Sequence, residues 1–318
     1  MIGRHHIEVK NRDAVFKFDI CRNITIVRGN SGTGKSTLYE MIADYTRLNE
    51  KSGVNLSCDK DCVALTDNDW KNQLSKTSDS IVFIDEGADC LKSTDFAGLI
   101  KKTDNYYVIF NRESLHELPY SVEEIYEIKT SGKQHTLKKI YKTNAEHVYY
   151  ISSAPKKLEY NTVVTEDSKS GYQFYKNYFA DTDIKCYTSG SNSALFGWLK
   201  DNIDKKALVI ADGAAFGAEI DRILKLGSAS KFRLCLPESF EWLILKSGLI
   251  KAKDIKKVLE TPENYVDSKK YFSWENFFEK YLVENTVGTP YQYAKSKLNP
   301  NYLKGNNSDK IIKEVYKK

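Results

Sequence analysis

The chain has 318 residues, 41% of them hydrophobic, which is enough apolar material for ordered cores in two domains of ordinary size. Lysine and arginine number 48 against 43 acidic residues, so the net charge of +5 permits contact with nucleic acid without establishing it. This composition excludes wholesale disorder, and no apolar run approaches the ~18 residues of a membrane-spanning helix. The first residues also lack the apolar core of a signal peptide. We therefore expect a cytoplasmic protein with no membrane partner and with reduced cysteines.

A glycine-rich loop lies between a predicted strand over residues 23–27 and a predicted helix over 37–43. The loop matches every position of the phosphate-binding pattern G-x-x-x-x-G-K-[ST], the Walker A motif of P-loop proteins. Its residues are Gly29, Asn30, Ser31, Gly32, Thr33, Gly34, Lys35, Ser36 and Thr37. Such a loop directs backbone N–H groups at a β-phosphate, at the positive end of the helix dipole. We expect Lys35 to neutralise the β- and γ-phosphates and the Ser36 hydroxyl to ligate Mg²⁺. The predicted cofactors are therefore ATP, or another nucleoside triphosphate, and Mg²⁺.

A second nucleotide element is predicted at residues 80–86, a short apolar run that ends in two acids and resembles a Walker B strand. We expect this strand to be a neighbour of the strand before the loop. Asp85 would hold Mg²⁺, and Glu86 would orient or deprotonate the attacking water. The acid pair favours hydrolysis over mere binding, so the chain is predicted to be an ATPase.

A third strand is predicted over residues 106–110, and two polar residues follow it. P-loop ATPases often place a residue that senses the γ-phosphate at this position, so Asn111 is the catalytic sensor candidate and Arg112 a weaker one. A transporter-type ATPase is disfavoured because no L-S-G-G-Q-like segment precedes Ile81. A small-molecule kinase is disfavoured because residues 113–130, where an arginine-rich lid would be expected, contain no arginine.

A polar, proline-bearing stretch at 152–157 reads as a linker, so we place a domain boundary near residue 155. Strands and helices then alternate, which predicts a parallel sheet with covering helices. The strands are expected at 162–165, 184–187 and 207–211, and the helices at 171–180, 193–202 and 217–226. The predicted fold class is α/β: a P-loop ATPase domain at 1–154, a smaller α/β domain at 155–250 and a helical region at 251–318.

Acids follow two strands of the second domain, where the chemistry of parallel sheets is usually placed. Glu166 follows the strand at 162–165, and Asp212 opens the sequence Asp-Gly-Ala-Ala-Phe-Gly after the strand at 207–211. Here the chain resembles a toprim domain, the metal-binding module of topoisomerases, primases and the overcoming-lysogenization-defect family of ATP-linked nucleases. That family has a Glu after its first strand and Asp-x-Asp-x-x-Gly after a later one. The resemblance implies a metal site formed by Glu166, Asp212 and a further acid, Glu241.

The chain departs from the family pattern at Ala214, which stands where the second aspartate is expected. A methyl group cannot ligate a cation that requires oxygen donors, so a two-metal cleavage site would lack a ligand. Two alternatives remain open. Glu219, Asp221 or Glu241 fills the gap and leaves an altered nuclease, or the module has lost its chemistry and recognises nucleic acid or a partner.

The last part of the chain is predicted to be helical at 251–260, 274–285 and 308–318. From residue 295 onward there are seven lysines against two acids, a basic tail that we interpret as a solvated helix rather than a phosphate-binding segment.

The two modules occur together in the overcoming-lysogenization-defect family, although this chain is shorter and lacks the long helical insertions of that group. The resemblance implies an ATP-hydrolysing protein that acts on or senses DNA or RNA, in antiviral defence against mobile elements. The alternative is an ATP-dependent switch or scaffold whose second domain, inactive as a nuclease, binds a protein partner. ATPases of this type commonly complete their sites across subunits, so an oligomer is consistent with this interpretation.

Overall fold

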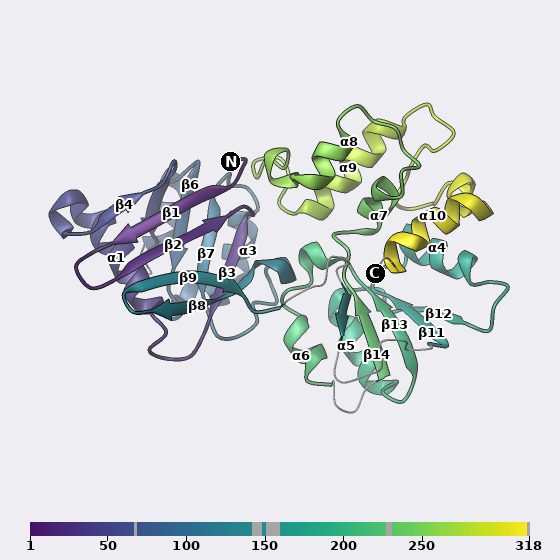
Figure 1. Cartoon of the computed structure of the whole chain (residues 1–318), viewed down its shortest axis with the longest axis horizontal. Coiled ribbons are helices and arrows are strands. Elements are labelled where there is room, and N and C mark those ends of the chain that lie inside the picture. The colour runs from purple at the N-terminus through teal and green to yellow at the C-terminus, as the bar shows by residue number, and fades with distance from the viewer. Residues whose placement is uncertain (67–68, 142–147, 151–159, 227–230, 317–318) are drawn as a thin grey trace. The chain divides into compact units, whose positions relative to one another are not determined.

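A computed structural model of the chain describes residues 1–66, 69–141, 148–150, 160–226 and 231–316 (Figure 1). The chain divides into two compact units. The first comprises Met1–Tyr141 and Thr261–Ser273, and the second comprises Lys142–Glu260 and Trp274–Lys318. Each unit has its own sheet and is described by itself. Within the described residues, no helix has both the length and the apolar character needed to cross a membrane.

The first unit is built on a nine-stranded sheet, counted over the residues that the structure describes, with the order β4-β1-β2-β9-β8-β3-β7-β6-β5. Its strands are β1 (His5–Lys10), β2 (Val15–Ile20), β3 (Ile24–Arg28), β4 (Asn55–Ser57), β5 (Asp61–Ala64), β6 (Ser80–Ile84), β7 (Tyr106–Phe110), β8 (Ile125–Ser131) and β9 (Gln134–Lys139), and its helices are α1 (Lys35–Leu48), α2 (Trp70–Lys76) and α3 (Thr94–Ile100). The β8–β3, β3–β7, β7–β6 and β6–β5 pairs are parallel. The β8–β9, β1–β2 and β1–β4 pairs are antiparallel.

The strands that carry the nucleotide elements lie in the middle of this sheet. Every residue of β3, β6 and β7 is buried, as expected for near-continuous apolar runs in parallel strands. The order β3-β7-β6 corrects one sequence expectation, because β6 is not the neighbour of β3: β7 pairs with both. The carboxyl ends of all three strands nevertheless meet at one edge of the sheet, which brings the segments after them together.

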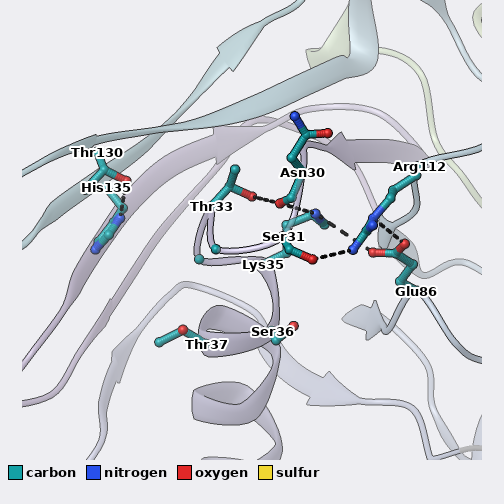
Figure 2. A pocket seen from close by; sticks show the side chains of 12 residues that line it. Asn30, Ser31, Thr33, Lys35, Ser36, Thr37, Glu86, Arg112, Thr130 and His135 are labelled. Carbon is teal, nitrogen blue, oxygen red and sulfur yellow. Dashed lines mark hydrogen bonds and ion pairs between the residues drawn. The ribbon is translucent and has the colours of Figure 1, made fainter.

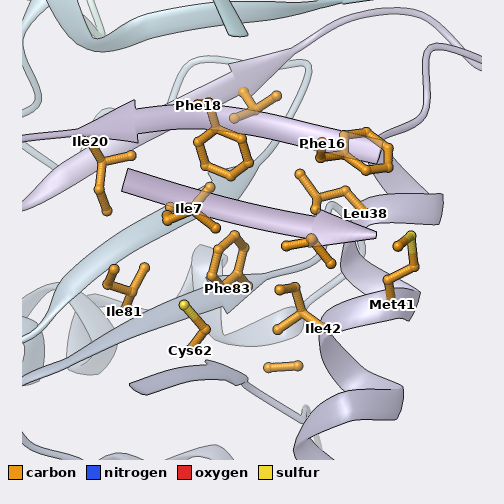
Figure 3. Close-up of a cluster of buried hydrophobic side chains, with 14 of the residues drawn as sticks. Ile7, Phe16, Phe18, Ile20, Leu38, Met41, Ile42, Cys62, Ile81 and Phe83 are labelled. Atoms are coloured by element: carbon orange, nitrogen blue, oxygen red, sulfur yellow. The ribbon is translucent and has the colours of Figure 1, made fainter. Parts of the chain in front are cut away.

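Helix α1 packs into the main apolar core of this unit (Figure 3). Leu38 and Ile42 of α1 share the cluster with Ile7 of β1, Phe18 of β2 and Phe83 of β6. β1 and β2 are neighbours, but β6 lies several positions from them in the sheet, so the sheet curls around the helix. Burial of this helix face anchors the amino end of α1, from which the phosphate-binding loop extends.

A segment from late in the sequence, Thr261–Ser273, completes the first unit. The Ser268 hydroxyl donates to the carbonyl of Asp104 at 2.7 Å, and the Asn23 amide donates to the carbonyl of Tyr271 at 3.3 Å. The predicted division into 1–154, 155–250 and 251–318 differs from the observed units here, because contacts between residues far apart in the sequence leave no periodic signal.

The second unit contains a five-stranded sheet within the described residues, with the order β10-β14-β13-β11-β12. Its strands are β10 (Val148–Tyr150), β11 (Thr162–Thr165), β12 (Lys185–Thr188), β13 (Lys206–Ile210) and β14 (Lys231–Cys235), and its helices are α4 (Ser170–Tyr178), α5 (Asn192–Asp201), α6 (Ile220–Leu224), α7 (Phe240–Lys246), α8 (Ile255–Glu260), α9 (Trp274–Thr286) and α10 (Gly305–Tyr316). β11 pairs in parallel with both β12 and β13, and β13 pairs in parallel with β14.

The alternation of strands and helices predicted for the second half is confirmed, and β11 has the predicted bounds. The fold is α/β in both units, as predicted. The predicted helical region does not form a unit of its own, because α8, α9 and α10 belong to the second unit. The linker predicted at 152–157 and the boundary near 155 lie outside the described residues.

Candidate functional site

The phosphate-binding loop runs from the end of β3 to the start of α1 and takes a tightly wound path. Gly29 has a φ of +143°, and a Cβ at this position would lie 2.9 Å from the Thr33 Oγ1 atom. Gly34 has a φ of +96° and immediately precedes α1. Side chains are strained in this region of φ, so both positions require glycine. The loop therefore presents its backbone to the cavity in front of α1.

Lys35 is the first residue of α1 and is only 5% exposed. Its Nζ donates to the carbonyl of Gly29 and, at 3.2 Å, to the carbonyl of Asn30. It also lies 3.8 Å from Oε2 of Glu86, in the turn after β6. Burial lowers the pKa of Lys35, and the Glu86 carboxylate opposes this shift. The loop carbonyls thus hold the ammonium group over the loop.

Arg112 brings a second cation to the same place (Figure 2). It follows β7, and its Nε lies 2.6 Å from Oε1 of Glu86, while its Nη2 donates to the Ser31 Oγ at 3.2 Å. One Glu86 carboxylate therefore contacts two cations, Arg112 at one oxygen and Lys35 at the other.

The two polar residues after β7 point in different directions. The Asn111 amide donates to the carbonyl of Glu113 at 3.0 Å, and Asn111 is 8% exposed. The structure thus brings Arg112, the weaker sensor candidate from sequence, against the loop, and directs Asn111 into its own turn. The sequence pattern favoured Asn111 over Arg112, but it does not determine which of the two faces the loop, because adjacent residues after a strand point to opposite sides.

A cavity of about 300 Å³ faces the loop. It is lined by the loop from Asn30 to Thr37, by Glu86 and Arg112, and by Thr130 and His135 of the β8–β9 hairpin. His135 had no functional signal in the sequence, where it stands as an isolated histidine. Its place beside the loop depends on the pairing of β9 with β2, which brings a distant hairpin to this edge.

The residues predicted to hold Mg²⁺ offer suitable donors. Ser36 is exposed in the first turn of α1 and lines the cavity, and Asp85 is half-buried at the end of β6, within electrostatic reach of Lys35. Hydroxyl and carboxylate oxygens are the donors that this hard cation prefers. The residues present therefore fit a magnesium ion bound together with a triphosphate.

In the second unit, the structure brings Glu166 and Asp212 together because their strands, β11 and β13, are parallel neighbours. The Asp212 backbone N–H donates to Oε2 of Glu166 at 3.2 Å. Burial, with a contribution from the Glu275 carboxylate, raises the pKa of Glu166 to about 8. Burial likewise raises the pKa of Asp212. The cavity beside the pair measures only about 20 Å³, which is room for about one water molecule.

Glu241, the third predicted metal ligand, contacts a hydroxyl and an ammonium group instead. Tyr293 donates to its Oε1 at 2.6 Å, and Lys295 Nζ lies 3.9 Å from the same oxygen. Lys295 also donates to Glu275 at 2.9 Å and to Glu279 at 3.1 Å, both on α9. Burial raises the pKa of Glu241, and Lys295 and Tyr293 oppose this shift. Lys295 was interpreted from sequence as part of a solvated tail, but it lies 20% exposed among these acids.

These contacts do not fit a two-metal centre. Ala214 is buried and offers no donor, and Glu219 is paired with Arg222. Over the part of the chain that the structure describes, no group of three or more histidine, cysteine, aspartate or glutamate residues is arranged to hold a metal ion. Lys295 supplies the positive charge that a metal ion would bring to the acids around Glu241.

A comparison of the chain with models of protein families, with curated proteins and with solved structures finds no match.

Proposed function

We propose that the first unit binds a nucleoside triphosphate with Mg²⁺ and hydrolyses it. The observation that carries this proposal is the meeting of Lys35, Glu86 and Arg112 at a glycine-rich loop that opens a helix. Backbone N–H groups and a helix amino end bind the β-phosphate, and the two cations neutralise the γ-phosphate.

Each side chain then has a separate role in hydrolysis. Ser36 and Asp85 would hold Mg²⁺, which when bound adds positive charge to the β- and γ-phosphates. Glu86 orients the attacking water and accepts its proton. Arg112 contacts the γ-phosphate and stabilises the negative charge that spreads over it in the transition state.

Phosphate release tests this proposal. Purified protein with Mg²⁺ and ATP should release inorganic phosphate, and Lys35→Ala should abolish the release. Phosphate transfer to an added acceptor in place of free phosphate would identify a small-molecule kinase. Calorimetry that detects no heat when the protein meets ATP or GTP with Mg²⁺ would refute the proposal.

For the second unit we propose a role in recognition that the ATP cycle regulates, with nucleic acid or a protein as the partner. Two features favour recognition over cleavage: Ala214 removes a metal ligand, and Lys295 already neutralises the acids around Glu241. The test incubates the protein with plasmid or single-stranded DNA, or with RNA, and with Mg²⁺ or Mn²⁺, in the presence and absence of ATP. Intact nucleic acid alongside ATP hydrolysis is the expected result. Cleavage that is lost in Glu166→Ala and Asp212→Ala would support a nuclease instead.

A further inference from the structure

An aromatic pair stands at the edge of the phosphate-binding loop. The ring of His135 on β9 stacks on the ring of Phe16 on β2, with centroids 4.3 Å apart and an angle of 17° between the planes. Phe16 is 1% exposed, whereas His135 is half-buried and lines the cavity. Phe16 therefore acts as a fixed backing for an imidazole ring that faces the cavity.

The pair is held in place from two sides. The Thr130 Oγ1 and His135 Nδ1 atoms lie 2.9 Å apart across the β8–β9 hairpin, which fixes the ring orientation. A Cβ on Gly34 would lie 3.6 Å from Phe16 Cε1 and 3.7 Å from His135 Nδ1. These are ordinary van der Waals distances, so the two rings lie directly beside the last glycine of the loop.

The position of the pair relative to the cations defines a direction along the cavity. Glu86 and Arg112 lie on one side of the loop, and His135 with Thr130 lies on the other (Figure 2). The γ-phosphate must face Glu86, because Glu86 orients the water that attacks this phosphate. The α-phosphate, ribose and base then extend to the opposite side, toward His135.

We propose that His135, backed by Phe16, is the platform on which the base of the bound nucleotide stacks. Every base has a π-face, and an imidazole ring stacks on it at low entropic cost because its orientation is already fixed. Purines overlap a ring of this size more fully than pyrimidines do, so the site takes a purine nucleoside triphosphate. This inference rests on the proposed function, since it needs a triphosphate in the loop.

Two ligands separate the base from the phosphates. Calorimetry measures the affinity of the full chain for Mg²⁺ with ATP and for Mg²⁺ with inorganic tripolyphosphate, which has no base. The variants are His135→Ala, which removes the ring, and His135→Phe, which keeps an aromatic face. Thr136→Ala is the matched control, because Thr136 is the next residue on β9, is exposed and points to the other face of the strand.

We expect His135→Ala to weaken ATP binding by about 5- to 150-fold, the range of base–aromatic stacking, and to leave tripolyphosphate binding within about twofold. His135→Phe should bind ATP within about threefold of the parent, and CTP should bind more weakly than ATP or GTP to the parent. Equal ATP affinity in His135→Ala and the parent, or an equal loss for ATP and tripolyphosphate, would overturn the platform but leave the phosphate site standing. A parent that binds neither ligand would overturn the proposed function and the platform with it.

Discussion

Arg112 holds Glu86 through a contact of 2.6 Å between Nε and Oε1, and Lys35 lies 3.8 Å from the other oxygen of the same carboxylate. The proposed base is therefore paired with the two cations that a γ-phosphate would also need. A bound γ-phosphate competes with Glu86 for both of them. The competition would free Glu86 for water only when a triphosphate is present, which couples binding to the start of hydrolysis.

Arg112 should therefore distinguish ATP from ADP. We expect Arg112→Ala to weaken ATP binding about tenfold, the effect of losing one charge-assisted contact, and to change ADP binding by no more than about twofold. The ATP affinity of Arg112→Lys should lie between those of the parent and Arg112→Ala, because lysine keeps the charge but lacks the several planar N–H donors of a guanidinium group. Arg47→Ala, at an exposed arginine that pairs with Asp44 on the same helix, is the control. Equal losses of affinity for ATP and ADP, measured by calorimetry, would show that Arg112 does not contact the γ-phosphate.

Glu86 should affect the chemical step and not the binding step. We expect Glu86→Gln to bind ATP at least as tightly as the parent, because it leaves both cations free for phosphate. Its rate of phosphate release should fall by about 100-fold or more, the usual contribution of a positioned base. Glu117→Gln, at an exposed acid that is not among the residues lining the cavity, should hydrolyse ATP at the parental rate. Turnover of Glu86→Gln at the parental rate would show that another group accepts the proton of the attacking water.

Lys35 should be required for binding itself. Its ammonium group is buried at the loop and would contact both terminal phosphates, so we expect Lys35→Ala to weaken ATP binding by about 100-fold, as for the loss of more than one charge-assisted contact. Lys51→Ala, outside the loop and cavity, is the control. Calorimetry with ATP and Mg²⁺ measures the affinity of both variants. Near-parental affinity in Lys35→Ala would argue against a phosphate site at this loop.

Local patterns in the sequence predicted much of this arrangement. The loop residues, the apolar strands β3, β6 and β7, and the approach of Glu166 to Asp212 all follow from short motifs at the carboxyl ends of parallel strands.

The positions of Arg112, His135 and Lys295 could not be predicted in the same way. The path of the chain after β7 decides that the Arg112 side chain faces the loop and the Asn111 side chain does not. His135 reaches the loop through pairing between β2 and β9, and Lys295 reaches Glu241 through a turn distant from it in the sequence. Contacts of this kind depend on tertiary packing, so no periodicity or spacing records them.

Lys295 should stabilise the second unit through its charge. Removal of one partner from a mostly buried ion pair leaves uncompensated charge, so we expect Lys295→Met to lower the free energy of unfolding by about 2 kcal/mol or more. Lys295→Arg, which keeps the charge, should lose less stability. The loss in Lys295→Met should be smaller at pH 5 than at pH 8, because the raised pKa of Glu241 leaves this carboxyl more fully protonated at pH 5. Urea unfolding at pH 5 and pH 8 measures these differences, and equal stability of Lys295→Met and the parent at pH 8 would contradict the assigned role.

Glu166 should make the stability of the second unit depend on pH. Its pKa is raised from an ordinary 4.5 to about 8, so between these pH values the folded chain keeps a proton that the unfolded chain releases. The free energy of unfolding therefore falls as the pH rises from about 4.5 to about 8. The raised pKa values of Asp212 and Glu241 act in the same direction. Glu166→Gln cannot ionise, so its stability should decline less steeply with pH than that of the parent.

Urea unfolding at a series of pH values measures the slope for the parent, for Glu166→Gln and for Glu260→Gln, a change at an exposed acid on α8. Tryptophan fluorescence is a suitable signal because Trp198, Trp242 and Trp274 belong to the second unit. The Glu260→Gln curve should run parallel to that of the parent, whereas the Glu166→Gln curve should converge with or cross it as the pH rises. If the Glu166→Gln curve also runs parallel, Glu166 is ionised in the folded chain throughout this range, and the half-buried, protonated carboxyl inferred beside Asp212 is wrong.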